Sequence, residues 1–170
     1  MDTTAQRPDS RGTDSPYAWY RLGIALLIST IGGAGMWSVV VVLPSVQAEF
    51  GTDRSTASLP YTLTMLGFAA GGVVAGKLSD RFGVIVPVAG GAICLAAGYI
   101  LSALSHDIIL FAIIHGVLIG MLGSATTFGP LVADTSMWFV RRRGIAVAIC
   151  ACGNYVAGTF WPPVVQHFVA

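Results

Sequence analysis

The charged residues of this chain are few, and a notable group of them lies between Gly76 and Gly83. The segment reads Gly-Lys-Leu-Ser-Asp-Arg-Phe-Gly, with long charge-free stretches on either side. The carboxylate of Asp80 can accept hydrogen bonds from backbone N–H groups, or pair with a guanidinium of the later run Arg141-Arg142-Arg143. Glycines at both ends allow a chain reversal within a few residues. The pattern predicts a charged hairpin between two helices.

Three polar residues inside or at the end of apolar stretches are candidates for proton coupling or substrate binding. His115 is expected roughly 10 Å deep in its stretch, where it can titrate near neutral pH or serve only as an interhelical hydrogen-bond partner. Asn154 is expected near the middle of its stretch, where its amide can bind an oxyanion or hydroxyl of a substrate or serve only as an interhelical hydrogen-bond partner. For Asp134, a structural pair with Arg141 or Arg142 is favoured over proton coupling.

Three further residues extend this set of substrate candidates, namely Thr126, Trp37 and Tyr61. Thr126 is expected at a depth comparable to that of Asn154. The two aromatic residues fall in the outer halves of their stretches, where packing explains them as well as a cavity wall does.

Several classes of protein are not indicated by the sequence. It contains no His-Glu-x-x-His, no phosphate-binding Gly-rich loop and no nucleophile–base pair, so we expect no enzyme activity and no cofactor. Cys94, Cys150 and Cys152 lie in apolar stretches, which favours packing over a metal site. Beyond the membrane-proximal arginines there is no basic face for nucleic acid.

The composition requires lipid as the solvent for most of the surface. The 170 residues are 55% hydrophobic and only 10% charged, with a mean hydropathy of +0.76. Five stretches reach the roughly 20 apolar residues that cross a bilayer. They cover residues 22–43, 55–75, 84–104, 108–133 and 145–165. Because open sheet edges cannot face hydrocarbon, all five are expected to be helices.

The basic residues predict how these helices are oriented. Of the nine present, all except Arg54 fall on one side if the amino terminus is cytoplasmic, as the positive-inside rule requires. For the three consecutive arginines, an anchoring role at the cytoplasmic face is then favoured over a role in substrate binding. Residues 1–21 are polar, contain two prolines and are expected to form a disordered cytoplasmic tail.

The end of the chain suggests that a longer protein has been cut. An odd number of helices leaves the last one without a following loop. The sequence Trp161-Pro162-Pro163 is expected to break this helix near its outer end.

The hairpin resembles the signature G-x-L-x-D-R-x-G-R-K between the second and third helices of the major facilitator superfamily. The matching residues are Gly76, Leu78, Asp80, Arg81 and Gly83. The last two basic positions of the signature are occupied by Val84 and Ile85. The position of the match between the second and third spans, on the predicted cytoplasmic side, agrees with the family.

A second segment is similar to the monocarboxylate-porter-like branch of that superfamily. Phe128-Gly129-Pro130, followed by Trp138-Phe139-Val140-Arg141-Arg142-Arg143, resembles the region before a Gly-rich fifth helix in that branch. The branch often carries a basic residue within its first helix, and residues 22–43 contain none.

The resemblance implies a secondary transporter with two six-helix bundles and alternating access to a central site. This chain would supply the first five helices of the N-terminal bundle, and a C-terminal helical half would be its missing partner. Asp80 would contact the other bundle and hold the cytoplasmic side closed; the alternative is that its charge only anchors the hairpin in water.

The expected function is transport of a small organic anion such as a monocarboxylate across the plasma or inner membrane, coupled to protons or to an exchanged solute. Two alternatives are a proton-coupled drug exporter and a truncated membrane scaffold that does not transport.

Overall fold

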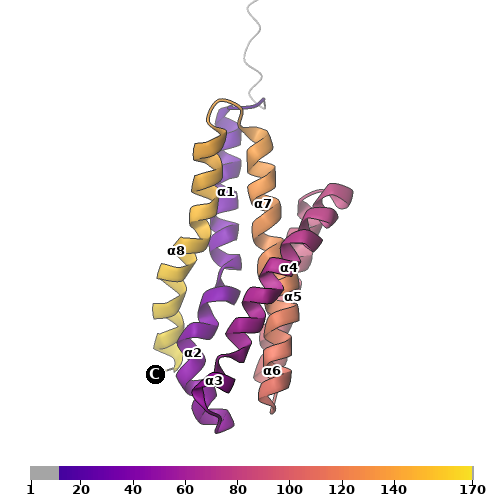
Figure 1. Cartoon of the computed structure of the whole chain (residues 1–170). Coiled ribbons are helices and arrows are strands. Elements are labelled where there is room, and N and C mark those ends of the chain that lie inside the picture. Colours follow the sequence, from indigo (N-terminus) through magenta and orange to yellow (C-terminus); the bar gives the residue numbers. More distant parts are fainter. Residues whose placement is uncertain (1–11, 170) are drawn as a thin grey trace, which may run out of the picture.

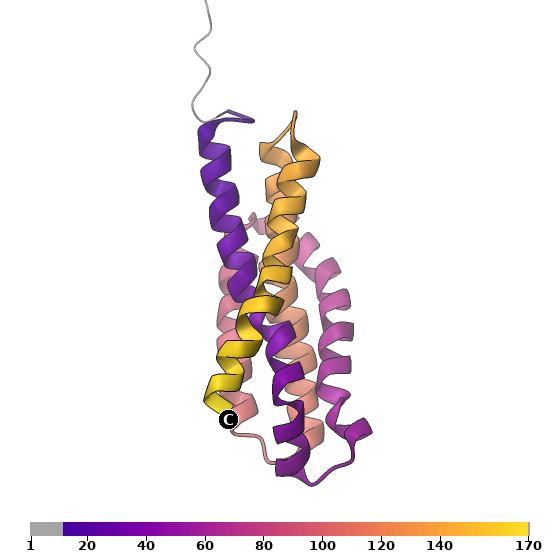
Figure 2. The ribbon, with the colours of Figure 1, turned by 90° about the vertical axis from the view of Figure 1, so that its left-hand side faces the viewer.

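The computed structural model describes residues 12–169, so most of the expected tail lies outside the described residues. The helices stand side by side in an elongated bundle whose turns lie at its two ends (Figure 1, Figure 2). They are α1 (Pro16–Gly32), α2 (Ala34–Phe50), α3 (Arg54–Ala57), α4 (Leu59–Phe82), α5 (Ile85–Ala103), α6 (Ile108–Ile114), the π-helix η1 (His115–Ser124), α7 (Ala125–Trp138) and α8 (Arg143–Val169).

These helices make five segments that are long and apolar enough to cross a membrane. The segments are Pro16–Phe50, Arg54–Phe82, Ile85–Ala103, Ile108–Trp138 and Arg143–Phe168, here called the first to fifth spans. The predicted all-helical, multi-span architecture is confirmed for the part of the chain that the structure describes. The end of the bundle that carries Arg141, Arg142 and Arg143 is called the arginine end below.

The first span begins earlier than the sequence suggested. We expected residues up to 21 to belong to the tail, but α1 starts at Pro16. The Ser15 hydroxyl caps it by accepting the N–H of Ala18 at 3.3 Å, and Pro16 stands in the first turn, where its missing N–H costs nothing. The polar composition of the preceding residues concealed this start.

The charged hairpin is mostly helix. The helix α4 continues through Asp80 and Arg81 to Phe82, and α5 begins at Ile85. Gly83 makes the reversal with a φ of 76°, a conformation that favours glycine. Gly76 lies inside the helix, so the expectation that both glycines form the turn is wrong for this one.

The expected break at Trp161-Pro162-Pro163 is also absent, because α8 continues through both prolines to Val169. Proline already has a helical φ, and membrane helices tolerate it where neighbouring groups satisfy the freed backbone. The indole Nε1 of Trp161 donates to the Thr30 carbonyl at 2.8 Å, which fastens this part of α8 to α1.

The helices are held together by two different kinds of contact. At mid-height, α4 lies against η1 through glycines: a Cβ on Gly67 would stand 2.0 Å from the Gly116 carbonyl oxygen, and one on Gly120 would stand 2.5 Å from that of Thr64. This approach brings two backbones together, as is common in membranes. At the arginine end, a cluster of buried side chains joins α1, α7 and α8, with Leu131, Phe139 and Cys150 among its members.

Candidate functional site

An ion pair joins two spans near the arginine end. Arg21 of α1 donates through Nη2 to Oδ2 of Asp134 on α7 at 2.8 Å, with side-chain exposures of 36% and 17%. The guanidinium also lies over the ring of Trp138, 4.5 Å from its centroid. The expectation that Asp134 pairs with Arg141 or Arg142 is therefore wrong. The helix ends at Trp138, so the later arginines do not continue along the face of Asp134.

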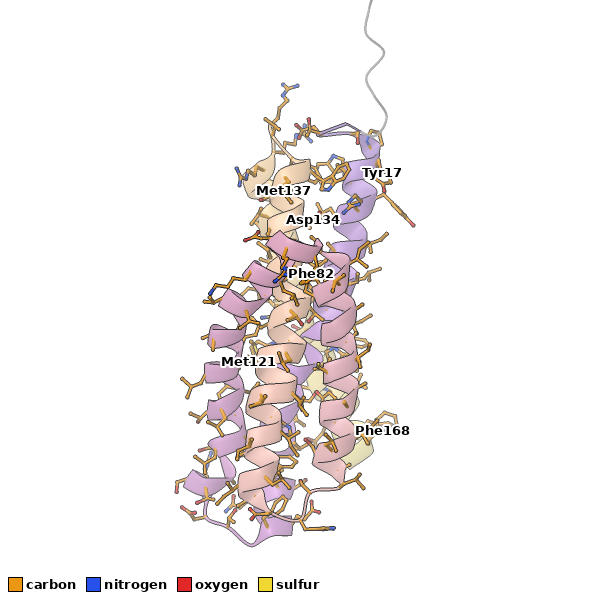
Figure 3. The ribbon with its side chains drawn as sticks, turned by 90° about the vertical axis from the view of Figure 1, so that its right-hand side faces the viewer. Tyr17, Phe82, Met121, Asp134, Met137 and Phe168 are labelled. Atoms are coloured by element: carbon orange, nitrogen blue, oxygen red, sulfur yellow. The ribbon has the colours of Figure 1, made fainter. Side chains whose placement is uncertain are left out.

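The tip of the α4–α5 hairpin makes few contacts of its own. Lys77, Asp80 and Arg81 are all exposed, and Arg81 lies over the neighbouring Phe82 ring at 5.2 Å. Among the described residues the Arg21–Asp134 pair is the only salt bridge, so the alternative that pairs Asp80 with the arginine cluster is not realised. Figure 3 shows Phe82, at the end of α4, below the level of Asp134 and Met137.

The α7–α8 turn, by contrast, is held by a residue that sequence reasoning assigned to the tail. Oδ2 of Asp14 accepts the backbone N–H groups of Val140 at 3.2 Å and Arg141 at 3.0 Å. These hydrogen bonds hold the pKa of Asp14 below its ordinary value of 3.8, because they stabilise the carboxylate. Arg143 reaches back to the Ser136 hydroxyl at 3.3 Å. Nothing in the sequence links Asp14 to a turn so distant along the chain.

At mid-height the first span is interrupted at Gly33, where α1 gives way to α2. The fourth span changes from η1 to α7 nearby, and the Ser124 hydroxyl donates to the Gly32 carbonyl at 3.2 Å. A Cβ on Gly32 would stand 2.2 Å from Thr127 Oγ1. The interruptions of the two spans therefore lie against each other.

Two substrate candidates use their polar atoms for helix packing. Nε1 of Trp37 donates to the Asn154 carbonyl at 2.9 Å, and the indole ring lies against Gly158. Thr126 is buried, and its hydroxyl donates within its own helix to the carbonyl groups of Leu122 and Gly123. The polar atoms of both residues are therefore engaged in contacts between or within helices.

The remaining candidates occupy different surroundings. Asn154 is half-buried on α8, with Nδ2 3.7 Å from the Met36 sulfur and Oδ1 turned toward Gly33. Tyr61 is half-buried on α4. The structure does not bring either of them together with the Arg21–Asp134 pair, which lies at the arginine end.

His115 is 3% exposed and begins η1. Its Nδ1 lies 3.0 Å from the Phe111 carbonyl and 3.3 Å from the Ser102 hydroxyl, and its ring stacks on Phe111 with centroids 4.2 Å apart. Because a carbonyl can only accept, the first contact requires a proton on Nδ1. The histidine is thus bound to both its own helix and α5.

A groove runs between the first span and α5. It consists of a cavity of about 820 Å³, to which His115, Tyr99 and Trp161 contribute, and one of about 560 Å³, to which Arg21 and Asp134 contribute. Ile31, Ala92 and Leu95 line both cavities, so the two lie next to each other. Most of the wall is apolar, with polar groups near each end. No group of three or more metal-ligating side chains occurs in the described part of the chain.

The arrangement of glycine-packed, interrupted helices around a membrane-deep groove is that of an integral membrane bundle, and comparison with known proteins identifies its family. The family model described as Major Facilitator Superfamily matches residues 25–170. The chain belongs to this superfamily.

Curated relatives share moderate identity with the chain. It is 31% identical over 118 residues to the MFS transporter asaE of Aspergillus flavus, covering 69% of this chain and 26% of the relative. It is 26% identical over 164 residues to monocarboxylate transporter 11 of Homo sapiens, covering 96% and 35%. A match of 31% over 98 residues, covering 58% and 21%, is to the Fujikurins efflux protein of Gibberella fujikuroi. The chain thus spans about a fifth to a third of these relatives' length.

Proposed function

We propose that the chain supplies five helices to the N-terminal bundle of a secondary transporter that moves a small organic anion, such as a monocarboxylate, by alternating access. The observation that carries this proposal is the match to monocarboxylate transporter 11 over 96% of the chain. No nucleotide-binding loop occurs in the sequence, so a proton or an exchanged solute is the expected source of energy. The transporter would lie in the plasma or inner membrane.

The groove supports the presence of a further helix in the complete bundle. The fourth span packs against both α4 and α5, whereas the first span packs chiefly on α8. Its face toward α5 leaves large apolar side chains, including Ile24 and Ile31, exposed. A sixth apolar helix from a longer chain would bury this face, and the relatives are long enough to contain it.

The arginine end is proposed to be cytoplasmic, and Asp80 to be a gating residue there. Its exposed carboxylate has no ion-pair partner among the described residues, so it is free to contact a second bundle. A contact formed in one state only would shift the population toward that state. We propose that Arg141 and Arg142 anchor this end at the membrane surface.

Among the candidates for substrate or proton contact, His115 and Asp134 line the groove. The side-chain amide oxygen Oδ1 of Asn154, near mid-height, can still accept a hydrogen bond. The polar atoms of Trp37 and Thr126 are engaged in helix contacts, which favours packing for both. Tyr61 stays a candidate wall residue. Replacing His115 with Gln should alter the pH profile of uptake if this histidine takes part in coupling.

The test is uptake by proteoliposomes containing the longest protein expressed from the reading frame of this chain. Monocarboxylates should be taken up, and a pH gradient should stimulate uptake if protons are coupled. Asp80→Asn should lower uptake without loss of protein from the membrane, whereas Asp107→Asn, at an exposed acid at the opposite end that does not line the groove, should not. Absence of uptake for the whole panel would contradict the proposed substrate class.

A second candidate function is export of a larger organic product, which the similarity to the Fujikurins efflux protein favours. The same vesicles distinguish the two. An exporter would move amphipathic compounds out of the compartment that contains Arg141 and would leave the monocarboxylates untouched. A reading frame that ends within the first bundle would instead favour a scaffold that does not transport.

A further inference from the structure

The residues just before α1 bend back onto the turn between α7 and α8. The backbone N–H of Asp14 donates to the Trp138 carbonyl at 3.0 Å, at the end of α7. Its carboxylate accepts the N–H groups of Val140 and Arg141 in the turn itself. One residue therefore satisfies an orphan carbonyl at a helix end and two N–H groups beyond it.

The backbone at Asp14 shows that this contact is specific. Its φ is 58°, and among the described residues it is the only one other than glycine with a positive φ. Aspartate and asparagine tolerate this left-handed conformation better than most residues, but it remains sparsely populated. It persists where surrounding contacts fix it, and here the three hydrogen bonds of Asp14 do so.

The neighbouring side chains contact the same turn. Tyr17 meets the edge of Trp138, with ring centroids 5.7 Å apart, and Trp19 meets Phe139 at 5.1 Å. Phe139 itself is buried. The hydrogen bonds of Asp14 thus lie beside packed aromatic rings, and these rings restrict the positions that residues 12–15 can take.

We infer that residues 12–15 form a strap, with Asp14 as its hook, that fastens the first span to the turn between the fourth and fifth spans. The strap ties the arginine end of α1, α7 and α8 into one unit, and its three connections come from a segment outside every membrane span. It does not depend on transport, so it can be true of a chain that moves no substrate.

The inference can be tested by crosslinking in membranes that contain this chain. Cys94, Cys150 and Cys152 are replaced with alanine, and cysteines are introduced by Thr13→Cys and Val140→Cys, which leave Asp14 in place. A short bifunctional thiol reagent should link this pair in most molecules. The pair Thr13→Cys with Phe82→Cys, on the exposed tip of the other hairpin, should link rarely.

Variants at the hook then decide whether the carboxylate holds the strap. Asp14→Ala should lower the crosslinking yield between positions 13 and 140 at least about threefold. It removes the hydrogen bonds from the carboxylate to the turn, which is comparable to removing the side chain that caps a helix. Asp14→Asn should retain most of the yield, because its amide oxygen still accepts and asparagine tolerates the left-handed backbone. An unchanged yield in Asp14→Ala, or equal linking to position 82, would overturn the inference.

A second measurement separates release of the strap from unfolding. For this, Cys150 is kept as the single native cysteine, and it is buried. If Asp14→Ala leaves the bundle folded, Cys150 should stay unreactive toward a maleimide that modifies it after the protein has been unfolded in a denaturing detergent. A reduced crosslinking yield together with protected Cys150 supports the strap, whereas reduced yield with a reactive Cys150 means that Asp14 is needed for the fold itself and contradicts a strap that acts locally.

Discussion

Two turns that connect consecutive helices lie at the arginine end, and they are built in opposite ways. The α4–α5 turn relies on Gly83 and presents Asp80, Arg81 and Phe82 to the surroundings. The α7–α8 turn buries Phe139 and is tied to Asp14. Both carry charges, but only the second has a backbone held by another segment. The α4–α5 tip therefore leaves its charges exposed, whereas the α7–α8 turn forms part of a fixed end.

The α4–α5 hairpin is nevertheless firmly attached, at a different height. The backbone of α4 lies against η1 at Gly67 and Gly71, in the middle of the bundle. The tip is therefore free because its contacts lie further down, not because the hairpin is loosely packed. This distinction makes separate predictions for the middle of α4 and for its end.

The largest effect is expected from Gly71→Val. A Cβ on Gly71 would stand 2.3 Å from the Met121 carbonyl oxygen, a backbone atom that cannot move without shifting η1. We expect a loss of about 3 kcal/mol or more in the free energy of unfolding. Thermal unfolding in detergent measures it. Gly72→Val is the matched control, because nothing lies within 4 Å of that position, and an equal loss there would contradict this account of α4.

A smaller effect is expected at the turn. Gly83 has φ 76° and ψ 175°, a region almost closed to other residues. Gly83→Ala should lower stability by about 1–3 kcal/mol through backbone strain. Gly76→Ala should leave stability unchanged or slightly raised, because this residue is helical with open space around it. If both variants behave alike in the same unfolding assay, Gly83 does not alone determine the turn.

The sequence predicted the architecture well because lipid imposes a simple rule. Apolar stretches of spanning length must be helical, and each of the five expected stretches overlaps one of the five spans. The residues at which the helices begin and end depend on weaker local interactions, such as capping hydrogen bonds. Residues 16–21 resembled a tail because polar residues precede them, although Ser15 and Pro16 form a recognisable helix start.

The partners of charged residues could not be found in this way. Arg141 and Arg142 are near Asp134 in the sequence, but Arg21, 113 residues away, is near it in space. The choice depends on how α1 packs against α7, which hydropathy does not specify. The strap shows the same limit, since a single aspartate before a helix carries no pattern that names a distant turn.

The ion pair gives an intermediate effect at the fixed end. Arg21→Ala or Asp134→Ala leaves a partly buried charge without its partner, and should lower stability by about 1–2 kcal/mol, since partial exposure screens the remainder. The double variant should lose less than the sum of the two, which a double-mutant cycle on unfolding free energies measures. Strict additivity would mean that the two side chains contribute independently.

The smallest effect is expected from pH at the strap. The pKa of Asp14 lies below its ordinary value of 3.8, because the N–H groups of Arg141 and Val140 stabilise the carboxylate. The contribution of Asp14 is therefore fully present above its unfolded pKa and is lost as the pH falls through its folded pKa. Spin labels can be attached at neutral pH to cysteines at positions 13 and 140. The distance between them should then be constant at neutral pH and increase only in acid below about pH 4. Asp14→Asn cannot titrate and should not show this increase. An acid-dependent increase in both proteins would assign the pH response to groups other than the hook, and the α7–α8 turn would then be no more firmly fixed by Asp14 than the tip of the other hairpin is by Asp80.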